Sequence, residues 1–149
     1  MTKIERVYRG VRVLRWIESQ GVVFYTGKAE RETAKRYLRH MPRVFPEYIS
    51  RLNAIYLYRM GEQEDKTHDA IIWNDVTSDI GTLYAVGISL EALARGEEYT
   101  QLVFTHELAH LDVPKHGGSF RMNLSGLLGR YNRATGARLK NEPPNPEWL

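Results

Sequence analysis

Three histidines and one glutamate lie close together between positions 106 and 116 of the chain. His106 and His110 are four positions apart, so on a helix both side chains leave the same face one turn apart. Two imidazoles at this spacing can bind one zinc ion, while Glu107 beside them can act on a water molecule at the metal. The pattern therefore predicts a zinc site with a glutamate base.

The third histidine of this group, His116, follows six positions after His110. Apolar residues around the first two histidines favour a buried helix over 100–112. Pro114 cannot continue that helix, so the chain turns and His116 can return to the metal from outside it. Asp112 is a rival third ligand, but it lies two positions after His110 and points away from that helix face.

The composition of the chain sets the limits of the fold. It has 149 residues, 42% of them hydrophobic, a formal net charge of +3 and no cysteine. This length favours one domain, which we expect over 1–140, followed by an extended proline-rich tail at 141–149. The lack of cysteine excludes disulfides and cysteine-ligated zinc. No signal peptide or membrane-spanning run is visible, so we expect a cytoplasmic protein.

Hydrophobic patterning predicts a mixture of helices and strands around the site. We expect helices at 4–18, 28–41, 90–95, 100–112 and 119–132, and strands at 22–25, 52–58, 70–73 and 82–88. The first of these helices is ambiguous, since it contains β-branched residues and a glycine. Gly87 marks either a bulge or the close approach of another backbone. The expected N-caps of the helices are Thr26, Ser89, Thr100 and Ser119.

The run from His106 to Phe120 reads HELAH, a third histidine six residues later, and then glycine and phenylalanine. It resembles the HExxH…HGxxF pattern of the SprT-like and WLM-type zincin metallopeptidases, and the likeness extends over about 70–132. The resemblance implies an α+β, zincin-like fold: a small twisted, mostly antiparallel sheet packed against an active-site helix and flanking helices. It also implies that His106, His110 and His116 bind Zn²⁺ and that Glu107 is the catalytic residue.

Two related families fit the sequence less well. Metzincins carry a glycine midway between the second and third histidines, where this chain has Val113. Gluzincins need a glutamate ligand on a following helix, and the helix expected at 119–132 contains no acidic residue. The SprT-like proteins often have a zinc ribbon or a DNA-binding extension. The lack of cysteine excludes a zinc ribbon of the usual kind, which puts proteolysis of DNA-bound proteins in doubt.

These residues predict hydrolysis of a peptide bond in a protein or peptide substrate by a zinc-bound water, with Glu107 as general base. Tyr84, Arg121 and Tyr131 are candidates to stabilise the oxyanion. The strand at 82–88 is expected to form an edge on which an extended substrate pairs. The alternative is a non-catalytic, zinc-stabilised module that binds nucleic acid or a protein partner through the basic helix at 28–41. Zinc-dependent hydrolysis of a substrate other than a peptide is a third possibility.

Overall fold

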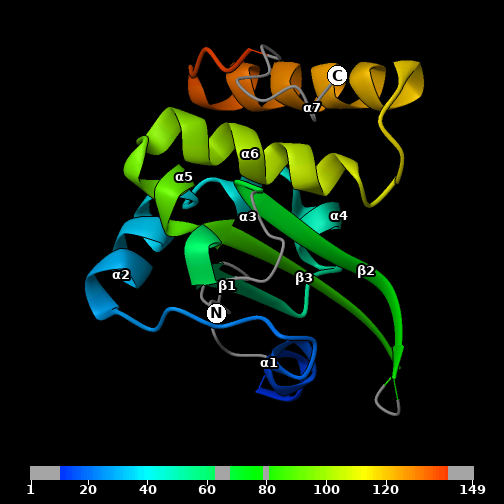
Figure 1. Cartoon of the computed structure of the whole chain (residues 1–149). Coiled ribbons are helices and arrows are strands. Elements are labelled where there is room, and N and C mark those ends of the chain that lie inside the picture. Colours follow the sequence, from blue (N-terminus) through cyan, green and yellow to red (C-terminus); the bar gives the residue numbers. More distant parts are fainter. Residues whose placement is uncertain (1–10, 63–67, 79–80, 141–149) are drawn as a thin grey trace.

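A computed structural model of the chain describes residues 11–62, 68–78 and 81–140. Its elements lie in one mixed α/β arrangement (Figure 1). In chain order they are α1 (Val11–Glu18), α2 (Lys28–Tyr37), α3 (Met41–Val44), α4 (Pro46–Ile49), β1 (Ala54–Tyr58), the 3₁₀ turn η2 (Met60–Glu62), β2 (Ala70–Ser78), β3 (Gly81–Ser89), α5 (Leu90–Ala94), α6 (Glu97–Ala109) and α7 (Gly118–Thr135). None of the described helices is long and apolar enough to cross a bilayer.

The sheet has three strands in the order β1-β3-β2. β3 runs parallel to β1 and antiparallel to β2, so the sheet is mixed rather than mostly antiparallel as expected. β2 and β3 form a hairpin, and β3 also pairs with β1 on its other side, so β3 is the central strand. The prediction that the strand at 82–88 forms an edge is wrong, since both of its sides are hydrogen-bonded.

The two outer strands differ in how their free sides are covered. The segment expected as a strand at 22–25 forms only an isolated bridge between Phe24 and Tyr58 of β1. Tyr25 also donates its backbone N–H to the carbonyl of Leu57, at 2.9 Å. Within the described residues, β2 pairs with β3 alone, and its other side is an open edge.

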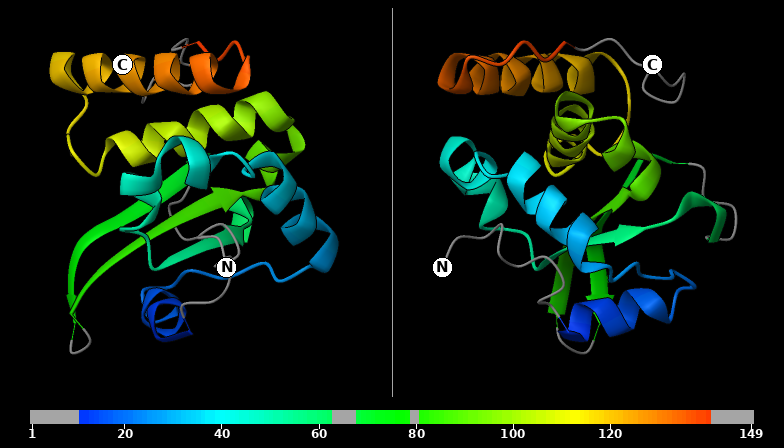
Figure 2. Two further views of the ribbon diagram at one scale, coloured as in Figure 1. Left: turned by 180° about the vertical axis from the view of Figure 1, so that it is seen from behind. Right: turned by 90° about the vertical axis from the view of Figure 1, so that its left-hand side faces the viewer.

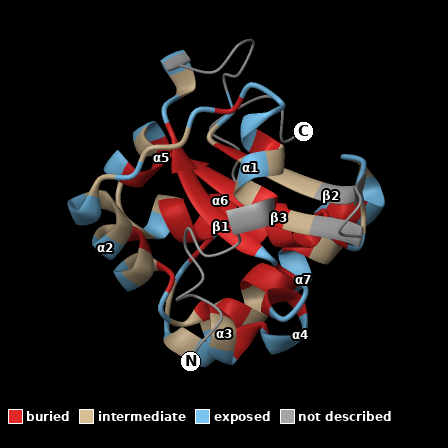
Figure 3. Ribbon diagram, turned by 90° about the horizontal axis from the view of Figure 1, so that it is seen from below, coloured by how far each residue is buried: buried red, intermediate tan, exposed pale blue. Residues whose placement is uncertain are grey.

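Helices cover both faces of the sheet, as Figure 2 shows. Alternate residues of β1 divide between two apolar clusters, because successive strand side chains point to opposite faces. Ile55 and Leu57 belong to the larger cluster, with α2 to α7, whereas Tyr56 and Tyr58 belong to the smaller cluster on the α1 side. Buried positions run along β1, the second half of β3 and α6, with exposed residues on the outer helices and loops (Figure 3).

Gly87 of β3 pairs with Tyr56 of β1, and the aromatic ring of Tyr56 lies across it. A Cβ atom at position 87 would lie 2.3 Å from that ring. The close approach expected at this glycine is therefore made by a side chain and not by a backbone. The irregularity in the sheet lies elsewhere, between Trp73 and Val76 of β2, which continues to Ser78 instead of ending at Trp73.

Several expected helix boundaries are wrong. The helix at 28–41 ends at Tyr37, and Pro42 lies in the first turn of the separate helix α3. Ser89 caps α5 by accepting from the N–H of Ala92, as predicted, but Gly27, Gly96 and Gly117 stand at the other three N-caps. The helix at 11–18 confirms part of the ambiguous first helix. Residues 4–10 and the tail at 141–149 lie outside the described residues.

Candidate metal centre

The helix α6 carries two of the three histidines through the interior of the protein. Its residues from Thr100 to Ala109 are all buried, and it packs against α7 and the sheet. It begins three residues earlier than expected, after Gly96, whose φ of 111° favours glycine. Glu97 and Glu98 occupy its first turn, where carboxylates interact favourably with the positive end of the helix dipole. The chain thus buries a helix that places polar ligands inside the core.

Three imidazole nitrogens meet at the C-terminal end of this helix. The Nε2 atoms of His106 and His110 lie 3.2 Å apart, as do those of His106 and His116. The Nε2 atoms of His110 and His116 are separated by 3.0 Å. Among the described residues, these three histidines are the group of potential ligands close enough to hold one metal ion. The structure therefore brings together all three predicted ligands.

The spacing of these nitrogens suits a shared cation. Ligand nitrogens of a tetrahedral zinc ion lie about 3.3 Å apart, given Zn–N distances of 2.0–2.1 Å. Three lone pairs directed at one point repel each other unless a positive ion lies among them. Burial, with His110 and His116 nearby, lowers the pKa of His106 to about 3, and burial also lowers the pKa of His110. Neutral imidazoles are the form that binds metal.

The tautomer of His110 follows from its second nitrogen. Its Nδ1 lies 3.2 Å from the carbonyl oxygen of Val113. Because a carbonyl only accepts hydrogen bonds, Nδ1 must carry the proton, and the lone pair of Nε2 is left for the metal. A carbonyl partner of this kind fixes the orientation of a metal-binding imidazole.

Phe120 packs against all three ligand rings. Its ring lies 4.3 Å from that of His110 in a stacked arrangement, and 4.8 and 5.0 Å from the rings of His106 and His116. Phe120 is fully buried in the first turns of α7. The sequence pattern singled out this phenylalanine, but the orienting contacts with each imidazole depend on how α7 packs against α6.

The acidic residues near the histidines have separate environments. Glu107 is only 7% exposed, and burial raises the pKa of its carboxyl group to about 8. It lies outside the group of metal-ligand atoms. Asp112, the rival ligand, accepts hydrogen bonds from Tyr48 and Arg51 instead. Asp112 lies outside the candidate ligand group, as predicted, but the reason differs: α6 ends at Ala109, and Asp112 belongs to the turn that follows.

The three oxyanion candidates lie in different places. Tyr131 is buried near the other end of α6, where it lines a polar pocket with Glu97 and Gln101. Since a helix rises about 1.5 Å per residue, this pocket is roughly 7–14 Å from His106, and Tyr131 is not part of the histidine site. Tyr84 lies beside the guanidinium of Arg51, and Arg121 is exposed directly after Phe120.

Comparisons of the chain with protein-family models, with curated proteins and with solved structures find no match.

Proposed function

We propose that this protein is a zinc-dependent metallopeptidase of the zincin type. The observation that carries the proposal is the convergence of the Nε2 atoms of His106, His110 and His116 within 3.2 Å of one another. Three imidazoles with an open fourth position are typical of catalytic zinc, whereas structural zinc sites are closed by four protein ligands. The glutamate next to the first histidine, Glu107, completes the pattern.

Each residue has a defined task in peptide hydrolysis. When bound, zinc would polarise the substrate carbonyl and lower the pKa of a water molecule towards ~7. Glu107 would take a proton from the attacking water and pass it to the leaving nitrogen. Burial raises the pKa of the Glu107 carboxyl group, so this group holds a proton more strongly than a carboxyl group in water does. Phe120 and the Val113 carbonyl hold the imidazoles in place.

The open edge of β2 is the proposed place for an extended substrate. This strand is antiparallel to β3 and carries unpaired backbone groups on its outer side, within the described part of the sheet. α6 packs against β2, so a peptide added along this edge would lie near the helix that bears the ligands. Pairing through the backbone would give affinity with little dependence on sequence. β2 replaces the strand at 82–88 in this role.

The decisive experiment is the variant Glu107→Gln. It removes the base but keeps a side chain of the same size, so we expect one zinc ion per chain as in the wild type. Hydrolysis of an unfolded protein substrate should fall by about 10²–10⁴-fold, the usual contribution of a general base. The matched control is Glu98→Gln, in the first turn of the same helix, which should leave both properties unchanged.

The outcomes of this experiment separate the candidate functions. If Glu107→Gln bound zinc and hydrolysed its substrate at the wild-type rate, the proposed mechanism would be wrong. If the zinc-loaded wild type hydrolysed no peptide bond, the alternatives would be a zinc-stabilised binding module or hydrolysis of another substrate. Two features of the segment 28–41 weigh against a nucleic-acid module: Arg39, just after α2, is paired with Glu97, and α2 itself carries Glu30 and Glu32.

A further inference from the structure

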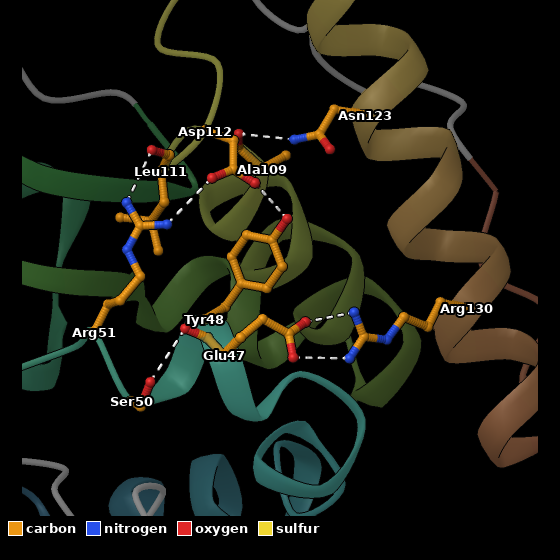
Figure 4. Close-up of polar contacts among 9 residues, drawn as sticks. All are labelled: Glu47, Tyr48, Ser50, Arg51, Ala109, Leu111, Asp112, Asn123 and Arg130. Carbon is orange, nitrogen blue, oxygen red and sulfur yellow. Dashed lines mark hydrogen bonds and ion pairs between the residues drawn. The ribbon is translucent and has the colours of Figure 1, made fainter.

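The turn between His110 and His116 is held by side chains that come from a distant part of the sequence. Arg51 donates from Nη2 to the carbonyl of Leu111, at 3.1 Å, and from Nη1 to Oδ1 of Asp112, at 3.2 Å. Tyr48 donates its hydroxyl proton to Oδ2 of the same aspartate, at 2.5 Å. Figure 4 shows the three side chains meeting at the end of α6. We call Tyr48, Arg51 and Asp112 the turn clamp.

A second contact, made by α7, holds the last residue of α6 just before this turn. Asn123 of α7 donates from Nδ2 to the carbonyl of Ala109, at 3.2 Å (Figure 4). The last carbonyls of a helix have no partner inside the helix and need donors from elsewhere. The carbonyl of Leu111 obtains its donor from Arg51, whereas the carbonyl of Ala109 also accepts from the backbone N–H groups of Asp112 and Val113, at 3.2 and 3.1 Å. The end of α6 just before His110 is therefore held by α7, and the start of the turn after His110 is held by Arg51.

The chemistry of the turn clamp favours a positioning role. Both carboxylate oxygens of Asp112 accept a hydrogen bond, one from a charged donor and one from a neutral donor. Burial and the contact with Asp112 raise the pKa of Tyr48 to about 12, so its hydroxyl remains a proton donor. The ion pair itself is partly exposed, with side-chain exposures of 38% and 43%, and such pairs contribute little to global stability.

We propose that the turn clamp positions the segment that carries His116, and that it thereby sets the affinity of the histidine site for zinc. The inference rests on the proposed metal centre and adds residues that do not touch the metal. His116 is exposed and lies outside any helix, so apart from the contacts of its ring with Phe120 and the other two histidines its position depends on the backbone of the turn. A ligand on a mobile turn loses conformational entropy when it binds, and that loss weakens the affinity.

The ion pair between Glu47 and Arg130 supplies a matched control. Glu47 is the neighbour of Tyr48 on α4, and its carboxylate binds the guanidinium of Arg130 on α7 through both oxygens. This pair joins the same region to α7 but does not contact the turn (Figure 4). Glu47→Gln should therefore disturb the packing of α4 to a similar extent while leaving the turn clamp intact.

The test compares Asp112→Ala, Tyr48→Phe and Glu47→Gln in the full chain. Zinc affinity is measured by competition with a chromophoric chelator, and the absorption of the Co²⁺-loaded protein reports the ligand geometry. We expect Asp112→Ala to weaken zinc binding about 10-fold and to change the Co²⁺ spectrum, by analogy with other residues that orient ligands. Tyr48→Phe should give a smaller change in the same direction, and Glu47→Gln should remain within about 2-fold of the wild type.

Two results would overturn the inference. One is wild-type zinc affinity in Asp112→Ala; the other is an equal loss in Glu47→Gln, which would trace the effect to general destabilisation. Tyr48→Phe removes a single hydroxyl group and keeps the test valid if Asp112→Ala does not fold. The measurement is independent of activity: failure of the proposed function would appear as zinc binding without hydrolysis, and failure of the turn clamp as hydrolysis with unchanged affinity.

Discussion

The two ends of α6 both gather polar side chains, but they use them differently. At the N-terminal end, Arg39 binds the carboxylate of Glu97 at 2.5 Å. Gln101 donates to the carbonyl of Tyr37 at 2.9 Å and to Glu97 at 3.3 Å. At the C-terminal end, the Nε2 atoms of His106, His110 and His116 face one another. The first group pairs opposite charges within the protein, whereas the second lies close enough together to hold one metal ion.

This difference separates a structural cluster from a candidate metal site. Side chains of opposite charge that pair within the protein have little net charge and few hydrogen-bonding groups available for a ligand, even where they line a pocket. Lone pairs that converge without an opposing charge are unfavourable in the protein alone and become favourable with a bound metal. The comparison therefore favours the proposed ligand binding at one end of the helix and helix anchoring at the other, and substitutions at the two ends test it.

The largest expected effect is that of His106→Ala. This change removes a buried ligand from the helix, so we expect zinc affinity to fall about 100-fold or more, with loss of stoichiometric metal from the purified protein. Metal content and chelator competition measure the effect. Glu97→Gln at the other end of α6 is the control: it should keep zinc affinity and cost under about 1 kcal/mol in the free energy of unfolding. Loss of zinc in the control would remove the distinction between the two ends.

The histidine cluster is the part of the structure that the sequence predicts best. Its geometry depends on short separations: His106 and His110 are one helical turn apart, and a short turn past Pro114 brings back His116. Interactions over such distances are set by local backbone geometry. The same holds for Ser89, whose cap on α5 is made with a residue three positions away.

The features that the sequence did not predict depend on distant partners. β3 is central because it pairs with β1. The pattern of apolar residues in 82–88 does not reveal which strand it pairs with. The turn clamp joins Tyr48 and Arg51, in a segment that reads as irregular, to Asp112 more than sixty residues later. Thr100 lost its expected capping role because Gly96 starts the helix earlier, and its hydroxyl donates instead to the carbonyl of Gly96.

A smaller effect is expected for His116→Ala. This histidine lies on an exposed turn, so its loss should weaken zinc binding by roughly 10-fold or more while His106 and His110 still hold the metal. The zinc-dependent rise in melting temperature should shrink accordingly, since a ligand stabilises the folded state according to its affinity. Thermal unfolding with and without zinc, alongside chelator competition, measures both quantities. Unchanged affinity would exclude His116 from the site.

The smallest effect is expected for Tyr131→Phe. This variant tests whether the N-terminal end of α6 has only a structural role. Tyr131 is fully buried and its ring stacks on Phe45, but its hydroxyl has no hydrogen-bond partner among the described residues. Burial raises its pKa to about 12, so the group stays protonated. Since an unsatisfied buried hydroxyl costs free energy, its removal should leave the free energy of unfolding unchanged or raise it by about 1 kcal/mol.

Zinc affinity and hydrolysis should both remain at wild-type levels in this variant, because Tyr131 lies at the opposite end of α6 from the proposed metal site. Urea denaturation, chelator competition and a peptidase assay measure the three properties. A loss of stability above about 1 kcal/mol would mean that the hydroxyl is satisfied by a partner such as an ordered water. A loss of hydrolysis with stability intact would return Tyr131 to the oxyanion role that the sequence suggested, and the two ends of α6 would then act as one site.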